Sequence, residues 1–309
     1  MCGIVGLYLK DPELRGKLGA FFGPMLAEMT DRGPDSAGFA VYRDGASSDA
    51  GETGGGETGA AKASLYDPDE RFDWAALAQA MGDDLGTRIA WDRVASHAVL
   101  RGAVRAKAMR DWLTANRPEV RVMSTGTSLE IYKEIGLPAD VMARFGVPQM
   151  TGTHMIGHTR MATESAVTTE GAHPFNTGED LCLVHNGSLS NHESLKRMLR
   201  REGLVFQTEN DSEVAAGYLA WRLSQGASLT EALEAGLKDF DGFYTFTVGT
   251  REGFAVIRDP IACKPAVMAE TDRWVAMASE FRALARLPGV EDARVWEPKP
   301  ATIYSWGTA

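Results

Sequence analysis

Cys2 is the side chain of this sequence best placed for covalent chemistry, because only Met1 precedes it. Methionine aminopeptidase removes an initiator methionine when the next residue is small, and the mature chain would then begin with Cys2. A free α-amine has a pKa near ~8, so it is partly neutral at physiological pH and can accept the thiol proton. One residue would then supply both nucleophile and base, without a His or Asp partner.

The other two cysteines, Cys182 and Cys263, are predicted to be structural. Cys182 lies in the apolar run LCLVH, where a free cysteine behaves as a small buried hydrophobe. Three widely spaced cysteines do not form a disulfide framework, and the sequence has no C-x-x-C pair. We therefore expect no metal or iron–sulfur site in this chain.

Short polar motifs follow Cys2 in a definite order. DRGPDSAG comes about one helix after the opening MCGIVG. The later motifs are GHTRMAT (157–163), HP (173–174), HNG (185–187), DSE (211–213), DGFYTF (241–246), RD (258–259), KP (264–265) and ASE (278–280). Each motif alone is weak evidence. The ordered set, anchored on Cys2, resembles the class II glutamine amidotransferases.

The resemblance implies a catalytic role for the Asn186–Gly187 pair. Attack of a thiolate on the glutamine amide creates a tetrahedral oxyanion, which needs preorganised hydrogen-bond donors. The Asn186 side-chain amide and the Gly187 backbone N–H, in a turn after a strand, would be those donors. Taken by itself, an Asn-Gly pair predicts an ordinary hairpin turn.

The resemblance also implies which residues hold glutamine. Arg160 would bind the substrate carboxylate through two parallel hydrogen bonds, with Thr163 adding another, and Asp211 would pair with the ammonium. In isolation, each charged residue would more commonly form a structural ion pair. Arg32 is expected to shape the loop near Cys2, and His173 to support the pocket.

The elements that must position these residues are mainly predicted strands. Apolar, β-prone runs contain or adjoin the motifs IGHTRMAT, LCLVHNG, FYTFTVG and FAVIRD, and helices are expected around 193–202, 213–225 and 229–240. The pattern is not an alternating βαβ fold, and G-x-G-x-x-G is absent. The resemblance implies an α+β protein, the four-layered α-β-β-α Ntn-hydrolase sandwich, with the glutamine amidotransferase type-2 domain spanning residues 1–309.

A long segment interrupts this pattern. Residues 44–64 are rich in Gly, Ser, Thr and Glu and are predicted to form a flexible loop. Residues 65–150 are too many for a plain loop and are predicted to form a small inserted α/β subdomain. Within it, 129–135 is expected to be helical. The stretch 123–141 resembles an insert of glutamate-synthase-type glutaminase domains.

Composition limits the partners. The formal net charge is −10, and Lys and Arg are scattered, so nucleic acid is not an expected partner. The N-terminus lacks the basic region of a secretory signal, and no apolar run is long enough to span a bilayer. We expect a soluble cytoplasmic protein without a membrane partner.

The expected function is hydrolysis of L-glutamine to L-glutamate and ammonia through a Cys2 thioester. Since no synthase domain is evident in the sequence, the resemblance implies a separate synthase subunit of the glutamate synthase or N-methylglutamate synthase type. This chain would carry no cofactor, and FMN and iron–sulfur clusters would belong to partner subunits. One alternative is a catalytically silent partner subunit of a synthase complex. Another is an Ntn hydrolase that acts on a different amide, such as a γ-glutamyl peptide.

Overall fold

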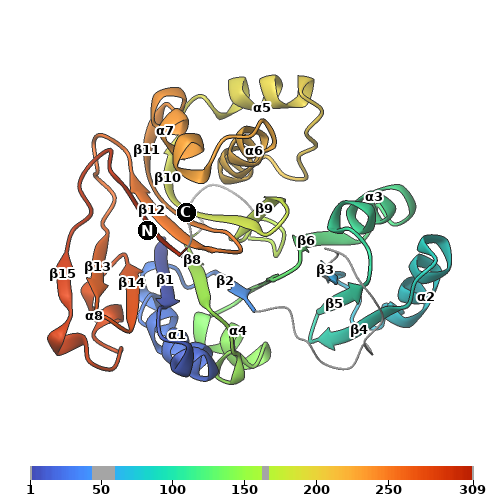
Figure 1. Ribbon diagram of the computed structural model, residues 1–309, viewed down its shortest axis with the longest axis horizontal. Helices are drawn as coiled ribbons and strands as arrows, with labels where there is room; N and C mark the ends of the chain where they lie inside the picture. Colours follow the sequence, from blue (N-terminus) through green and yellow to red (C-terminus); the bar gives the residue numbers. More distant parts are fainter. Residues whose placement is uncertain (1, 44–59, 162–166, 308–309) are drawn as a thin grey trace.

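The computed structural model describes residues 2–43, 60–161 and 167–307. Two large antiparallel sheets face one another, helices cover the outer face of each, and a smaller sheet with two helices stands to one side (Figure 1). This confirms the predicted α+β class and the four-layered α-β-β-α sandwich. Among the described helices, none combines the length and the apolar character needed to cross a membrane.

The seven-stranded sheet contains the N-terminal strand near its centre. Its order is β15 (Arg294–Trp296), β13 (Val267–Glu270), β14 (Trp274–Ala278), β1 (Gly3–Leu9), β8 (His154–Arg160), β2 (Ser36–Tyr42) and β7 (Leu129–Ile135). The side chains of β1 alternate between the two faces: Ile4 packs between the large sheets, whereas Val5 and Leu7 pack under the helices. Burial on both faces explains the continuous apolar sequence of this strand.

The five-stranded sheet is built around the strand that contains the HNG motif. Its order is β16 (Ile303–Gly307), β12 (Gly253–Arg258), β11 (Gly242–Gly249), β10 (Leu181–Leu189) and β9 (Phe175–Gly178). In β10, Cys182 and Val184 face the other large sheet, while Leu181 and Leu183 face the helices. Cys182 is fully buried, whereas Cys263 is exposed, so the expected burial of Cys263 was wrong.

Helices close both sides of the sandwich. On the seven-stranded sheet they are α1 (Leu18–Ala27), α4 (Pro138–Arg144) and α8 (Phe281–Leu284), and on the five-stranded sheet they are α5 (His192–Arg201), α6 (Asp211–Ser224) and α7 (Leu229–Asp239). Short 3-10 turns cover Pro12–Lys17, Thr30–Arg32, Val147–Gln149 and Val290–Asp292. Ser228 and Glu231 form a capping box that fixes the start of α7.

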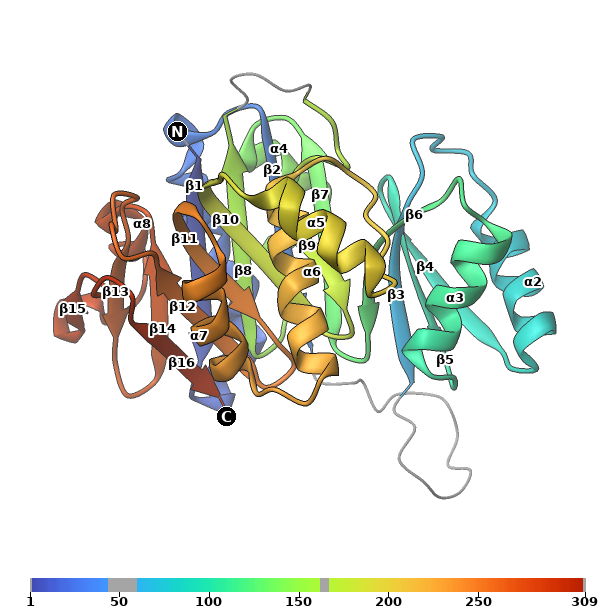
Figure 2. The same cartoon turned by 90° about the horizontal axis from the view of Figure 1, so that it is seen from above.

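The smaller sheet has its own hydrophobic core. Its order is β4 (Ile89–Val94), β5 (His97–Gly102), β3 (Ala61–Tyr66) and β6 (Arg121–Gly126), and α2 (Trp74–Leu85) and α3 (Ala106–Asn116) pack on it. Figure 2 shows this unit beside the four-layered body. We call residues 61–126 the inserted subdomain.

The boundaries of this unit differ from the predicted ones at both ends. Residues 61–64 were expected in a loop, but they begin the buried strand β3; residues 44–59 lie outside the described residues. At the other end, residues 129–135 form strand β7 and not a helix, because all seven residues pair with β2 in the large sheet. The segment after residue 126 therefore belongs to the body.

Candidate active site

Cys2 lies at the start of β1, at one end of the large sheets, and is half-buried. Its carbonyl oxygen accepts hydrogen bonds from Arg32 Nε at 3.0 Å and from Asn186 Nδ2 at 3.2 Å. Arg32 in turn forms an ion pair with Glu280 at 2.8 Å. The backbone of Cys2 is therefore held by the 3-10 turn Thr30–Arg32 and by β10, and these contacts do not involve its thiol.

Asn186 and Gly187 lie inside strand β10 and not in a turn, contrary to the prediction. Pairing with β11 continues past them to the Leu189–Gly242 register, so no hairpin forms at the Asn-Gly pair. Gly187 has φ 150°, and a Cβ there would lie 2.0 Å from the Phe243 carbonyl oxygen. Only glycine fits this position.

Arg160 ends strand β8, immediately after Thr159, which pairs with Gly3. The Arg160 side chain is largely buried, and its carbonyl oxygen accepts a hydrogen bond from the backbone N–H of Asp35 at 3.1 Å. Arg160 and Cys2 thus lie at the ends of adjacent strands. Thr163, the other predicted carboxylate contact, lies outside the described residues.

Asp211 is the first residue of α6, and its carboxylate is extensively bonded. One oxygen accepts the Leu189 N–H at 2.9 Å, and the other accepts the Ser212 hydroxyl at 3.2 Å and lies 3.7 Å from His185 Nδ1. Burial alone would raise the pKa of Asp211, but the contact with His185 and the other hydrogen bonds lower it to about 2. The carboxylate is therefore ionised, as an ammonium ligand must be.

The sequence is similar to known proteins. Residues 158–286 match the family model described as a glutamine amidotransferase domain. The chain is 55% identical to the glutamine amidotransferase-like protein GlxB of Rhizobium meliloti (strain 1021), over 99% of this chain and 98% of that protein. The chain belongs to the class II glutamine amidotransferases.

Two longer amidotransferases match this chain over only part of their own length. An amidophosphoribosyltransferase of Methanocaldococcus jannaschii is 30% identical over 59% of this chain and 40% of that protein. The solved structure of the glutamine phosphoribosylpyrophosphate amidotransferase from B. subtilis, complexed with ADP and GMP, matches 99% of this chain with a TM-score of 0.61 at 20% identity. The match covers 47% of that structure, so the chain spans about half of its length. This structural match supports the fold described above.

Three buried histidines of this amidotransferase, His158, His173 and His185, form a group next to Asp211. The rings of His158 and His173 lie 4.1 Å apart, and the Ser212 hydroxyl contacts His173 Nε2 at 2.8 Å and His185 Nδ1 at 2.9 Å. The one proton of this hydroxyl is donated to Asp211, so both imidazoles must donate to its oxygen. Burial lowers the pKa of His158 to about 3 and that of His173 well below 6.5. Both rings are therefore neutral near pH 7.

This histidine group gives His173 a specific place. His173 hydrogen-bonds to Ser212, and Ser212 hydrogen-bonds to Asp211. His173 therefore contacts the candidate ammonium ligand only through Ser212. In the described part of the amidotransferase, no three His, Cys, Asp or Glu side chains are arranged to hold a metal ion.

Several contacts in the amidotransferase site were not predicted. Glu280 pairs with Arg32, the Ser279 hydroxyl accepts the Ile4 N–H at 2.9 Å, and His185 and Ser212 support Asp211. Each of these residues lies within a motif of the family pattern: ASE, HNG or DSE. The motifs were therefore the available signal, but they did not indicate which side chains meet.

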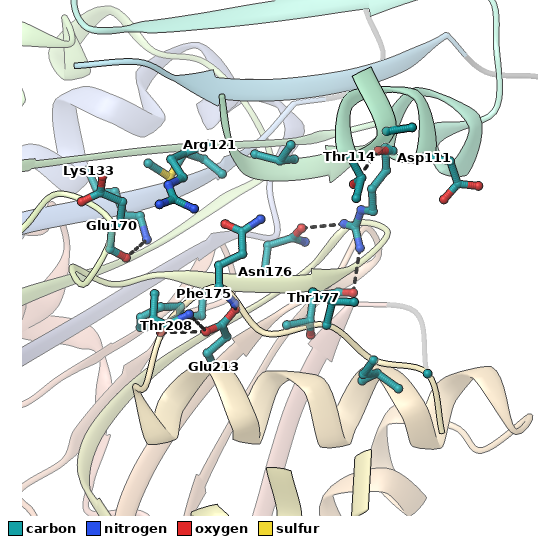
Figure 3. A pocket seen from close by; sticks show the side chains of 18 residues that line it. Asp111, Thr114, Arg121, Lys133, Glu170, Phe175, Asn176, Thr177, Thr208 and Glu213 are labelled. Atoms are coloured by element: carbon teal, nitrogen blue, oxygen red, sulfur yellow. Dashed lines mark hydrogen bonds between the residues drawn. The ribbon is translucent and has the colours of Figure 1, made fainter. Parts of the chain in front are cut away.

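A cavity of about 500 Å³ lies elsewhere, between the inserted subdomain and the body (Figure 3). Neither Cys2, Arg160 nor Asn186 lines it. This cavity is therefore distinct from the candidate glutamine site, and we consider it separately below.

Proposed function

We propose that this chain is a glutaminase subunit that hydrolyses L-glutamine to L-glutamate and ammonia, with Cys2 as the nucleophile. The observation that carries the proposal is the 3.2 Å contact between Asn186 Nδ2 and the Cys2 carbonyl oxygen. It brings a side-chain amide donor from one sheet to the residue that would bear the thiol and the free α-amine. The two residues are 184 positions apart in sequence.

In the proposed first step, the Cys2 thiol gives its proton to its own α-amine and its sulfur attacks the side-chain amide carbon of glutamine. The amide oxygen becomes an oxyanion, stabilised by the Asn186 side-chain N–H and the Gly187 backbone N–H. The C–N bond then breaks, the leaving nitrogen takes a proton from the α-ammonium, and ammonia departs. Water hydrolyses the remaining γ-glutamyl thioester and releases glutamate.

The proposed substrate contacts use three residues. Arg160 binds the glutamine carboxylate as a bidentate donor, Thr163 adds a hydrogen bond, and Asp211 pairs with the ammonium. The low pKa of Asp211, about 2, and the largely buried position of Arg160 support this assignment. Both contacts recognise the amino-acid head group and leave the side-chain amide free to reach Cys2.

The ammonia is proposed to pass to a separate synthase subunit of the glutamate synthase type, which would carry FMN and iron–sulfur clusters. The name of GlxB, a glutamine amidotransferase-like protein, is compatible with this role but names no partner. Affinity purification of the tagged chain from its native host should recover a synthase-like protein. Recovery of the chain without such a protein would contradict the partner proposal.

The nucleophile is tested by labelling with 6-diazo-5-oxo-L-norleucine, a glutamine-mimicking alkylator, followed by intact and peptide mass spectrometry. We expect loss of Met1 and a single adduct on Cys2 that excess L-glutamine prevents. Retention of Met1, or no adduct even with the partner present, would refute the proposed chemistry.

That negative result would favour the second candidate, a silent subunit that keeps the fold without turnover. The intact set of Cys2, Asn186, Gly187 and Asp211 argues against it. A γ-glutamyl peptide hydrolase is separated from a glutaminase by comparing L-glutamine with γ-glutamyl dipeptides as substrates.

A further inference from the structure

The cavity of about 500 Å³ joins two parts of the molecule that the amidotransferase chemistry does not use. Helix α3 and strand β6 of the inserted subdomain form one wall, and strand β9 and residues 203–208 of the body form the other (Figure 3). Three basic and three acidic residues line it, so its formal charge is balanced. The cavity has no excess of positive charge to bind a polyphosphate or another strongly anionic ligand.

Most of the charged groups in the cavity are already bonded. Arg110 donates to the Thr177 carbonyl oxygen at 2.8 Å and to Asn176 Oδ1 at 2.9 Å. The Glu213 carboxylate accepts the N–H groups of Gln207 and Thr208 at 2.8 and 2.7 Å. These groups build the walls and have little capacity left for a ligand.

The buried amine of Lys133 is also committed to the protein. Its three protons match three backbone acceptors, the carbonyl oxygens of Glu170 at 2.9 Å, Ala172 at 2.7 Å and Pro174 at 3.3 Å. Lys133 therefore holds the segment 170–174 in place and is not offered to a ligand.

Two opposite charges remain. Neither the Arg121 guanidinium nor the Glu170 carboxylate forms a hydrogen bond or ion pair with any described residue, although both line the cavity. They come from different parts of the chain, Arg121 from β6 of the subdomain and Glu170 from the segment before β9. They do not pair with each other, so a ligand that carries both a negative and a positive group could bridge them.

The cavity also offers apolar surface next to these charges. The buried Met123 lines the subdomain wall, and the buried Phe175 lines the body wall together with Leu204. We propose that this cavity binds a free amino acid with an apolar side chain. Its carboxylate binds Arg121, its ammonium binds Glu170, and its side chain packs against Met123, Phe175 and Leu204.

Such a ligand would contact segments that also build the candidate glutamine site. Glu213 in the cavity wall directly follows Ser212, which supports Asp211. Glu170 precedes Gly171, where an added Cβ would lie 3.4 Å from Arg160 Nη1. The proposed site is thus positioned to act as an effector site, but its ligand binding does not depend on the proposed glutaminase function.

The proposal is tested by isothermal titration calorimetry of the full chain with L-methionine, L-leucine and L-phenylalanine, in the presence of saturating L-glutamine. Two further probes each lack one charge: 3-phenylpropanoate has no ammonium, and 2-phenylethylamine has no carboxylate. We expect at least one of the amino acids to bind, and each L-phenylalanine analogue to bind at least about tenfold more weakly than L-phenylalanine, because a charge-assisted hydrogen bond is lost.

Matched variants locate the binding. Arg121→Gln and Glu170→Gln should each weaken amino-acid binding about tenfold, since each removes one charge from the cavity. Arg105→Gln and Glu119→Gln change exposed residues that do not line the cavity, and should bind as the wild type does. No binding by any of the three amino acids, unchanged binding in both cavity variants, or equal affinity for the single-charge analogues would overturn the proposal.

Discussion

At the residue scale, the candidate site holds the proposed nucleophile, Cys2, by its backbone. Arg32 and Asn186 both donate to the Cys2 carbonyl oxygen, and the Ser279 hydroxyl accepts the N–H of Ile4, the second residue of β1. Fixing the backbone restricts where the thiol can lie without consuming the thiol or the α-amine. The site is thus preorganised around Cys2.

Replacing the nucleophile tests the residue-scale proposal directly. Cys2→Ser keeps a small residue after Met1 but substitutes a hydroxyl whose pKa is far higher. We expect the diazo-oxo-norleucine adduct to disappear and glutamine hydrolysis to fall at least about a thousandfold, with little change in melting temperature. Cys263→Ser, at an exposed cysteine, is the control and should retain both adduct formation and glutamine hydrolysis. Hydrolysis that persists in Cys2→Ser would contradict the assignment.

The proposed oxyanion donor makes a second residue-scale prediction. Asn186→Ala should lower kcat about 10²- to 10³-fold and change KM little, because the lost hydrogen bond forms in the transition state. Steady-state kinetics of glutamine hydrolysis measure this. Asn116→Ala, at the end of α3 in the inserted subdomain, is the control. A variant with raised KM and normal kcat would place Asn186 in substrate binding and not in oxyanion stabilisation.

At the element scale, the site depends on strand ends that meet at one edge of the sandwich. Strand β1 starts there, β8 ends there, and β10 passes beside them with Asn186 and Gly187. The turn between β6 and β7 connects the inserted subdomain to the same body. Asp180 holds this turn: its carboxylate accepts the N–H groups of Thr127, Ser128 and Leu129, each at 2.9 Å.

Removal of this carboxylate should loosen the junction. Asp180→Ala leaves three backbone donors of the β6–β7 turn without their acceptor, so we expect the free energy of unfolding to fall by about 3 kcal/mol or more. Asp180→Asn retains a carbonyl oxygen and tolerates the observed φ of 51°, so its loss should be smaller. Urea denaturation of both variants measures the difference. Equal losses would show that the carboxylate charge, and not the mere presence of a side-chain oxygen acceptor, stabilises the turn.

At the scale of the whole molecule, five of the six histidines are buried. Burial lowers the pKa of His97, His154 and His158 from 6.5 to about 3 in each case. These rings are neutral in the folded state over most of the acidic range. The unfolded chain, in contrast, would bind protons on them below about pH 6.5.

The fold should therefore lose stability on acidification. Between pH 6.5 and about 3 the unfolded state binds more protons than the folded state, so the free energy of unfolding decreases as pH falls. The slope is up to about 1.4 kcal/mol per pH unit for each buried histidine. Urea denaturation at about pH 7.5 and about pH 5 measures it. Replacement of the more exposed His192 by Gln should leave the slope unchanged, and a flat profile in the wild type would contradict the prediction.

The sequence by itself determined the family and the fold class, and it indicated the candidate site residues. The proposed nucleophile, oxyanion donors and head-group ligands are constrained by chemistry, so they lie in short motifs in a recognisable order. Strands such as β1 and β10 were predictable because residues buried on both faces give continuous apolar runs.

Only the tertiary structure decided which of these residues meet. Asn186 reaches Cys2, and Glu280 reaches Arg32 from 248 positions away, because the packing of two sheets sets these contacts and no local pattern encodes them. The same reason explains the wrong prediction for 129–135. Its sequence permits a helix, but pairing with β2 buries it as the edge strand of the large sheet, and that neighbour is distant in sequence.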